Sequence, residues 1–238
     1  MGVLSGKTAV VTGASSGIGR AIALRFGKEG ARGALLARRK NRLEEVAREI
    51  EKEGSEALVV PADLLDPKQI SKAFADIRRQ WKDPEILVNN AGTGFFGPLA
   101  ESKLEEYETT FNLNVRAFYL ATREVLPAMI RAREGTIINI ASIAGKMGLA
   151  GSAIYCASKF AVMGLSEALL EEVRSYNIRV AVICPGLVST EFFGRTDAKG
   201  NRPDFIQPED VAGAALLCAT GTQTACFKEM VIRPRRPV

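Results

Sequence analysis

Short apolar runs alternate with amphipathic helical patterns along almost the whole chain of 238 residues. The apolar runs predict strands at residues 8–12, 33–37, 57–60, 85–89, 135–141, 178–184 and 229–232. Helical patterns occupy residues 17–28, 41–52, 67–81, 104–133, 152–176 and 208–219. Strands that are apolar throughout and alternate with helices indicate a parallel sheet that is covered on both faces. The pattern therefore predicts a doubly wound α/β fold of the Rossmann type with about seven strands, which binds ligands beyond the carboxyl ends of its strands.

No repeat, low-complexity tract or linker interrupts this pattern. Hydrophobic residues make up 47% and charged residues 25% of the chain, which is ordinary for a globular protein. We therefore expect residues 1–238 to form a single dinucleotide-binding domain. The polar segment around residues 190–206 is expected to form a substrate loop with a mobile lid.

A glycine-rich turn follows the first predicted strand, within the segment Thr12–Gly19. Glycines allow a tight turn and close approach of a ligand, and the start of the next helix offers free N–H groups to an anion. The spacing is Gly-x-x-x-Gly-x-Gly rather than the common Gly-x-Gly-x-x-Gly fingerprint. Any strand-to-helix turn can need glycine, but its place after the first strand of a parallel sheet favours phosphate binding.

The second predicted strand ends in Ala37, Arg38 and Arg39. In this fold an acidic residue at that point would accept hydrogen bonds from the adenosine ribose of NAD. Arginine instead pairs with a 2′-phosphate in a fork geometry. We therefore predict a preference for NADP(H). The alternative is a solvated basic start of a helix, which accounts for Lys40 and Arg42 better than for Arg38.

Several classes of function are disfavoured by composition. The chain has no histidine, and its four cysteines form no CxxC pair, so zinc sites built on Cys/His spacing are not expected. Nucleophilic catalysis of the Ser-His-Asp or Cys-His type is excluded, and acid–base chemistry must use Tyr, Lys, Asp or Glu. The net charge is a modest +5, and the basic cluster lacks a nucleic-acid reading motif, so no nucleic-acid partner is expected.

The start of the chain lacks a signal-peptide pattern, and the longest apolar runs are too short to span a bilayer. We expect a cytoplasmic protein with reduced thiols and no membrane partner.

Tyr155 and Lys159 are four residues apart within a helical pattern and therefore share one face of the helix. A nearby ammonium favours the phenolate and lowers the pKa of a tyrosine from its usual value near ~10. The pair could thus form a tuned proton donor and acceptor in a cleft. Taken alone, two residues that share a helix face by coincidence are the better interpretation.

In combination, these segments resemble the short-chain dehydrogenase/reductase family over essentially the whole chain. The residues that carry the resemblance are the segment Thr12–Gly19, Asp63, Asn89–Gly92, Asn114, Ser142, Tyr155, Lys159, Pro185, Gly186 and Thr190. Each motif is moderately specific, whereas their order and spacing together are highly specific.

The resemblance implies hydride transfer between NADP(H) and a carbonyl or secondary alcohol carbon, with Tyr155 exchanging the proton of the oxygen. Ser142 would hydrogen-bond that oxygen, and Lys159 would bind the nicotinamide ribose and lower the pKa of Tyr155. Asn114 would hold a water that links Lys159 to solvent. The alternatives are that Ser142 only ends a strand and that Asn114 is an ordinary polar residue on a helix face.

The resemblance also assigns the cofactor site, in which Asp63 contacts the adenine amine and Asn90–Gly92 lines the adenosine. Pro185, Gly186, Val188 and Thr190 would frame the nicotinamide amide, although Asn90 and Gly92 could instead only support the sheet edge. The full expected set is Gly13, Ser15, Ser16, Gly17, Ile18, Gly19, Arg38, Arg39, Asp63, Leu64, Asn90, Ala91, Gly92, Tyr155, Lys159, Pro185, Gly186, Val188 and Thr190.

A small-molecule carbonyl or alcohol is the expected substrate, bound by the loops at residues 93–97, 143–151 and 191–205. Apolar side chains are expected to form its wall: Phe95, Phe96, Met147, Leu149, Phe192 and Phe193. A general carbonyl reductase or alcohol dehydrogenase ranks first, and a 3-hydroxy acid dehydrogenase second.

Two alternatives rank lower. A 3-oxoacyl-[acyl-carrier-protein] reductase usually has a Gly-Gly-rich end after its last strand, whereas this chain ends in Met230–Val238 without one. A non-enzymatic NADP-binding regulator would be expected to have lost Tyr155 or Lys159. By resemblance, the helices that start at Leu104 and Ser152 would pair across a two-fold axis in a homodimer or homotetramer.

Overall fold

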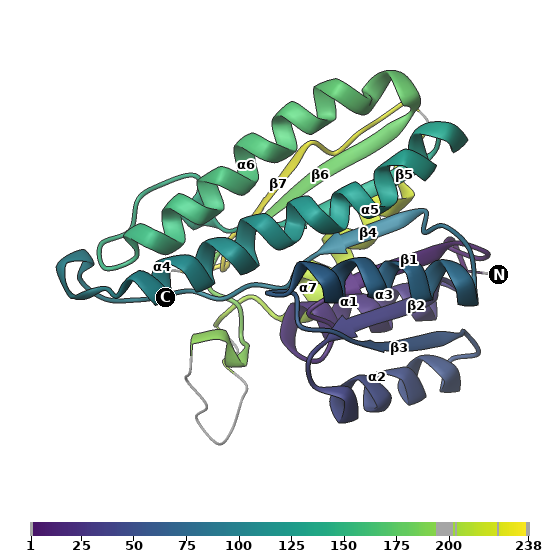
Figure 1. Cartoon of the computed structure of the whole chain (residues 1–238), viewed down its shortest axis with the longest axis horizontal. Coiled ribbons are helices and arrows are strands. Elements are labelled where there is room, and N and C mark those ends of the chain that lie inside the picture. The colour runs from purple at the N-terminus through teal and green to yellow at the C-terminus, as the bar shows by residue number, and fades with distance from the viewer. Residues whose placement is uncertain (1, 194–201, 203, 223, 237–238) are drawn as a thin grey trace.

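A seven-stranded parallel sheet forms the centre of the protein (Figure 1). The structure is a computed structural model that describes residues 2–193, 202, 204–222 and 224–236. Every neighbouring pair of strands is parallel, in the order β3-β2-β1-β4-β5-β6-β7. The strands are β1 (Thr8–Thr12), β2 (Arg32–Ala37), β3 (Ala57–Pro61), β4 (Ile86–Asn89), β5 (Gly135–Ile140), β6 (Ile178–Pro185) and β7 (Glu229–Ile232). The predicted doubly wound Rossmann-type fold is confirmed.

Helices cover both faces of the sheet. They are α1 (Gly17–Lys28), α2 (Lys40–Lys52), α3 (Pro67–Gln80), α4 (Leu104–Phe111), α5 (Ala117–Ala132), α6 (Ala153–Val173) and α7 (Pro208–Thr220). Figure 1 shows α3, α5 and α6 in front of the sheet, with α1 and α7 behind it.

The two faces of the sheet pack two separate cores because successive strand residues point to opposite sides. In β1, Ala9 and Val11 join the core formed with α1, α2 and α7. Val10, between them, joins the core formed with α3, α5 and α6. Strands buried on both faces favour apolar residues at most positions, which explains their largely apolar sequences.

The order of the strands reverses at β1, whose two neighbours are β2 and β4. The chain leaves β1 and β4 toward opposite halves of the sheet, so the loops after these strands diverge and leave a crevice between them. This point lies at the carboxyl ends of the strands. The fold therefore offers a ligand site between the glycine-rich turn after β1 and the segment after β4.

The helix predicted over residues 104–133 contains an irregularity that the sequence pattern does not reveal. A single π-helical segment, Asn112–Arg116, joins α4 to α5. Such segments widen the helix locally and often occur at functional sites. Asn114 lies in this segment and is completely buried.

Helix α6 is long and apolar enough, by length and composition alone, to cross a membrane. Within the helical span Ala153–Tyr176, an 18-residue window has a mean hydropathy of 1.3, and 50% of that window is buried inside the protein. This finding differs from the expectation that the apolar runs are too short, because that expectation counted only uninterrupted runs. The helix packs against β6 and contributes Leu169, Leu170 and Val173 to the core, so its apolar character follows from its buried position.

The lid expected around residues 190–206 is only partly described. A short 3₁₀ helix spans Glu191–Phe193, and Val188 pairs with Ile206 in an isolated parallel bridge. Residues 194–201 and 203 lie outside the described part of the chain.

A chain of buried polar side chains links the two central strands to α6. Asn89 of β4 donates a hydrogen bond from Nδ2 to Asn139 Oδ1 of β5 at 2.9 Å. Asn139 in turn donates from Nδ2 to Ser166 Oγ of α6 at 2.8 Å. All three residues are buried, and Asn139 supplies one of several hydrogen bonds in the group, since Asn89 also donates to Thr122 Oγ1 and Ser166 to Val162 O.

We expect Asn139→Ala to lower the free energy of unfolding by about 1–3 kcal/mol, because Asn89 and Ser166 would each lose a buried hydrogen bond to the Asn139 side chain. Chemical denaturation monitored by circular dichroism measures the change. Asn41→Ala, at an exposed position in α2, is the matched control, with a change within about 0.5 kcal/mol. Equal effects of the two substitutions would contradict a stabilising role of the buried chain.

Candidate active site

A cleft of about 440 Å³ lies at the carboxyl ends of the strands and is lined from both halves of the sheet. Arg38 and Arg39, which follow β2, lie at one end, and Ser142, which follows β5, lies toward the other. The volume falls within the range of small-molecule and cofactor sites. With two exceptions, every predicted site residue lines this cleft: Gly13, Ser15, Ser16, Gly17, Ile18, Arg38, Arg39, Asp63, Leu64, Asn90, Ala91, Gly92, Ser142, Tyr155, Lys159, Pro185, Gly186, Val188 and Thr190.

The exceptions are Gly19 and Asn114. A Cβ atom on Gly19 would lie 2.4 Å from both Gly13 O and Asn90 Nδ2. Gly19 is therefore needed for the close packing of α1 against the turn behind the cleft. Its predicted contact with the cofactor stays a prediction, and the described packing gives the third glycine of the spacing a structural role as well.

The turn after β1 is built to receive an anion. Gly13 and Gly17 adopt positive φ angles of 68° and 53°, which favour glycine. Ser16 precedes α1 without capping it through its side chain, and the first turn of α1 contains no acidic residue. The N–H groups at the start of α1 therefore lack a side-chain acceptor, and the helix dipole favours a negative group there.

Asn90 ties the segment after β4 to the end of β1. Its Nδ2 donates to Thr12 O at 2.9 Å, and its backbone N–H donates to Thr12 Oγ1 at 2.9 Å. The Ala91 N–H donates to the same hydroxyl at 3.1 Å. Asn90 thus supports the edge of the sheet, as the simpler interpretation proposed, and also lines the cleft.

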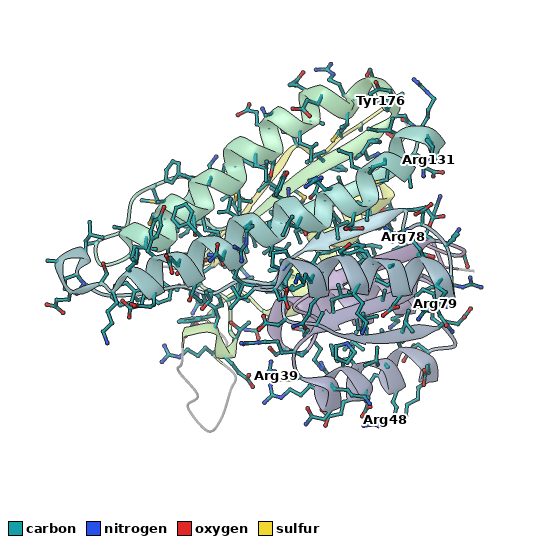
Figure 2. All side chains as sticks on the ribbon, viewed as in Figure 1. Arg39, Arg48, Arg78, Arg79, Arg131 and Tyr176 are labelled. Atoms are coloured by element: carbon teal, nitrogen blue, oxygen red, sulfur yellow. The ribbon has the colours of Figure 1, made fainter. Side chains whose placement is uncertain are left out.

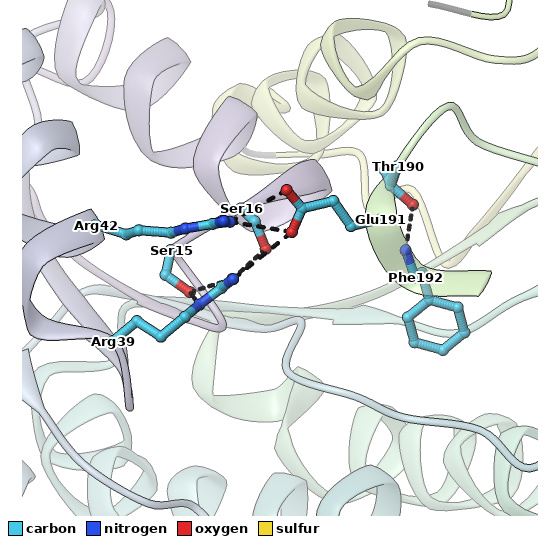
Figure 3. Close-up of polar contacts among 7 residues, drawn as sticks. All are labelled: Ser15, Ser16, Arg39, Arg42, Thr190, Glu191 and Phe192. Carbon is cyan, nitrogen blue, oxygen red and sulfur yellow. Dashed lines mark hydrogen bonds and ion pairs between the residues drawn. The ribbon is translucent and has the colours of Figure 1, made fainter. Parts of the chain in front are cut away.

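Arg39 lies at the basic end of the cleft and contacts the glycine-rich turn (Figure 3). Its Nη2 donates to Ser15 Oγ at 3.0 Å and to Ser16 Oγ at 2.7 Å. Its Nη1 also lies 3.6 Å from Glu191 Oε2. Figure 2 shows Arg39 beside the short helix that follows β6. Arg38 lines the same end of the cleft.

Tyr155, Ser142 and Lys159 come together at the far end of the cleft. Tyr155 is only 7% exposed, and Ser142, whose Oγ accepts a hydrogen bond from the Ala144 N–H at 3.1 Å, lines the same end of the cleft. Lys159 is 4% exposed and donates from Nζ to Ile140 O at 2.9 Å. The helix places the two side chains on one face, as their spacing predicts, with Lys159 Nζ 5.8 Å from the centroid of the Tyr155 ring.

Asn114 approaches this group from behind the cleft. Its Oδ1 accepts a hydrogen bond from the Thr93 N–H at 2.9 Å, and its Nδ2 donates to Thr93 O and Ser158 Oγ at 2.8 and 2.9 Å. The side-chain amide therefore fixes the loop after β4 against α6. The expectation that this residue holds a water for Lys159 is not supported by its side-chain contacts.

Comparison with known proteins agrees with this geometry. The family model described as short chain dehydrogenase matches residues 7–201. The chain belongs to the short-chain dehydrogenase/reductase family. It is therefore an oxidoreductase, and several similar solved structures of the family contain NADP.

Individual members of the family match almost the whole chain. A metagenomic short-chain oxidoreductase in complex with NADP is 38% identical, with a TM-score of 0.87 and coverage of 99% of this chain and 100% of that one. An alcohol dehydrogenase from the archaeon Thermococcus sibiricus, complexed with 5-hydroxy-NADP, is 26% identical, with a TM-score of 0.90 and coverage of 98% and 99%. Glycine betaine reductase of Emericella nidulans is 33% identical over 98% of this chain, which spans only 19% of that protein.

Burial has the largest effect on the pKa values of Tyr155 and Lys159 in this short-chain dehydrogenase/reductase. Desolvation raises the pKa of Tyr155 to about 12, against a smaller lowering by the hydrogen bond with Ser142. Desolvation also lowers the pKa of Lys159 to about 8. The expectation that Lys159 lowers the pKa of Tyr155 is therefore not met in the cofactor-free protein, because the ammonium is itself desolvated and its hydrogen bond goes to Ile140.

Some residues that line the cleft are not predicted from the sequence. They are Ala37, Ala62, Leu65, Leu113, Ile140 and Ala141. The residues that end or follow β2, β3 and β5 could have been found from the rule that ligands bind beyond strand ends. Leu113 had no signal, because its position depends on the π-helical turn. Glu191 lies in the expected substrate loop, but its contact with the arginines at the basic end was not predicted.

Among the described residues, no group of three or more Cys, Asp or Glu side chains could hold a metal ion.

We expect the unfolding free energy of the cofactor-free protein, relative to a Lys159→Met variant, to rise by an amount on the order of 1 kcal/mol between about pH 7.5 and pH 9.5. The folded protein releases the Lys159 proton near a pKa of about 8, whereas the unfolded chain holds it until about 10.5. The unfolded state binds more protons across this window, so the stability increases with pH. Denaturant titrations at the two pH values measure this, and a constant difference would show that Lys159 stays charged.

Proposed function

We propose that this protein is an NADP(H)-dependent oxidoreductase that interconverts a carbonyl compound and a secondary alcohol. The observation that carries the proposal is the meeting of Tyr155, Ser142 and Lys159 at one end of a cleft whose other end presents Arg38 and Arg39. NADP(H), when bound, supplies or accepts the hydride.

The residues at the Tyr155 end suit proton donation to a carbonyl. Because burial raises its pKa to about 12, Tyr155 holds its proton at neutral pH and can donate a hydrogen bond to a substrate oxygen. Ser142 offers a second hydroxyl for the same oxygen and steadies its developing charge. Lys159 lies within reach of hydroxyl groups bound near Gly92, since its Nζ is 3.8 Å from the position that a Gly92 Cβ would take.

The donor set of the cleft also suits a dinucleotide with a 2′-phosphate. The glycine-rich turn and the start of α1 provide N–H groups for the pyrophosphate. Ser15, Ser16 and the two arginines provide hydroxyl and guanidinium donors where β2 ends, and the last residue of β2 is Ala37 rather than an acidic residue that would bind a ribose hydroxyl. The NADP bound to the metagenomic relative is consistent with this preference.

The substrate side of the cleft is aromatic. The rings of Phe96 and Phe192 lie 5.3 and 5.9 Å from that of Tyr155, measured between centroids. Phe96 and Phe192, both predicted as apolar wall residues, therefore reach the reacting group, and like Met147 and Leu149 they are also exposed to solvent. This favours uncharged carbonyl compounds over 3-hydroxy acids and over 3-oxoacyl thioesters on an acyl carrier.

The remaining proposals concern assembly and place of action. Large exposed apolar side chains on α4, α5 and α6 support a homodimer or homotetramer through these helices: Leu104, Tyr107, Tyr119 and Phe160. A cytoplasmic location with a small-molecule substrate, and without nucleic acid or membrane as partners, completes the proposal.

Tyr155→Phe should lower kcat/KM by about 10²–10⁴-fold, because it removes the proton that reaches the substrate oxygen. NADPH oxidation measured with ketones, diketones, 3-oxo acids and 3-oxoacyl thioesters identifies the substrate class and gives the rates of both proteins. The dissociation constant for NADPH should change by less than about threefold, since the ring remains.

Normal turnover of the Tyr155→Phe variant would contradict this role of the residue. NADPH binding by the unaltered protein without turnover of any carbonyl compound would instead favour a non-enzymatic NADP-binding regulator.

Arg39→Ala should raise the dissociation constant for NADPH by about 10–100-fold and leave that for NADH nearly unchanged, because only NADPH carries the 2′-phosphate that a guanidinium binds. Fluorescence titration with both cofactors measures the two constants. Arg48→Ala, at an exposed position of α2 outside the cleft, is the control. A protein that binds NADH more tightly than NADPH before any substitution would refute the preference.

A further inference from the structure

The basic end of the cleft already holds a carboxylate, that of Glu191 (Figure 3). Arg42 donates from Nη1 to both of its oxygens, at 3.2 Å to Oε1 and 3.0 Å to Oε2. Arg39 Nη1 lies 3.6 Å from the same Oε2 while Arg39 Nη2 binds Ser15 and Ser16. The Arg39 guanidinium therefore contacts both the glycine-rich turn and the Glu191 carboxylate, and the Arg42 guanidinium binds the same carboxylate.

The ion pairs of Glu191 with Arg39 and Arg42 are weak enough for another anion to displace the carboxylate. The side chains of Arg39, Arg42 and Glu191 are 43%, 39% and 52% exposed. Ion pairs between side chains with this exposure contribute little to stability, because solvent competes for both partners. A dianionic phosphate pairs with guanidinium groups more strongly than a single carboxylate does.

The same carboxylate is coupled to the reacting end through the next residue. Glu191 and Phe192 belong to one short 3₁₀ helix, and the Phe192 N–H donates to Thr190 Oγ1 at 3.4 Å. The Phe192 ring lies 5.9 Å from the Tyr155 ring. The ion pairs that hold Glu191 therefore also fix the position of the Phe192 ring beside Tyr155.

The loop that carries these residues also contacts the glycine-rich turn directly. A Cβ atom at Gly17 would lie 3.1 Å from Thr190 Cγ2. The segment Thr190–Phe192 thus spans the cleft from the phosphate turn to Tyr155, and Glu191 is its attachment to α2.

We propose that Glu191 is a positioning residue whose carboxylate competes with the 2′-phosphate of NADP(H) for Arg39 and Arg42, so that cofactor binding detaches Phe192 from its place over Tyr155. The inference rests on the proposed NADP(H) function and deepens it. Like charges cannot share the two guanidinium groups without repulsion. NAD(H) has no group that displaces the carboxylate, so the competition is specific for the phosphorylated cofactor.

The first test is the affinity of Glu191→Gln for NADP⁺ and NAD⁺, measured by isothermal titration calorimetry without turnover. We expect NADP⁺ to bind about 2–10-fold more tightly than to the unaltered protein, and NAD⁺ to bind within about twofold. Glu49→Gln is the matched control, because it removes the same charge from an ion pair with Arg20 of similar exposure that lies outside the cleft. Unchanged or weaker NADP⁺ binding by Glu191→Gln overturns the competition.

The second test follows Phe192 itself, with 4-fluorophenylalanine at position 192 and ¹⁹F NMR. Adenosine 2′,5′-bisphosphate is the probe, because it carries the 2′-phosphate but has no nicotinamide that could touch the ring directly. We expect this probe to shift the resonance while 5′-AMP leaves it in place, and Glu191→Gln to shift it before any ligand is added. Equal responses to the two nucleotides overturn the coupling.

Failure of this inference can be told apart from failure of the proposed function. An unaltered protein that binds NADP⁺ no more tightly than NAD⁺ overturns both. If the unaltered protein binds NADP⁺ more tightly than NAD⁺, but Glu191→Gln has the same affinities as the unaltered protein, only this inference is overturned.

Discussion

The hydrogen bonds between the end of β1 and the segment after β4 hold the two halves of the cleft together. The Thr12 hydroxyl accepts hydrogen bonds from the backbone N–H groups of Asn90 and Ala91, and the Asn90 side chain donates one to the Thr12 carbonyl. These strands are neighbours in the sheet but far apart in the chain. The close packing of Gly19 behind this junction explains why α1 begins where its N–H groups can face the cleft.

Burial is the second constraint, and it acts in opposite directions on the two ionisable groups of α6. Tyr155 and Lys159 are both removed from water, so the neutral form of each is favoured. The phenol keeps its proton more firmly, and the ammonium releases its proton more easily. A pair that resembles an acid and a base from its spacing alone is thus, in the cofactor-free protein, a proton donor beside a cation destabilised by desolvation.

Regular features of the structure could be predicted from the sequence. The strand bounds differ from the expected runs by at most a residue at an end, because strands buried on both faces must be apolar throughout. Most cleft residues could be assigned because they follow strand ends. Asn114 and Glu191 could not be understood in this way, since the role of the first depends on a π-helical turn and that of the second on a loop reaching across to α2.

The sequence by itself determined the doubly wound sheet, the position of the glycine-rich turn and the shared face of Tyr155 and Lys159, because each follows from local periodicity or spacing. Only the tertiary structure decided how these groups are protonated and which charges meet. Desolvation depends on every element packed around a group, and the meeting of Arg42 with Glu191 depends on the fold bringing distant segments to one edge of the sheet. Neither is encoded in any short stretch of the chain.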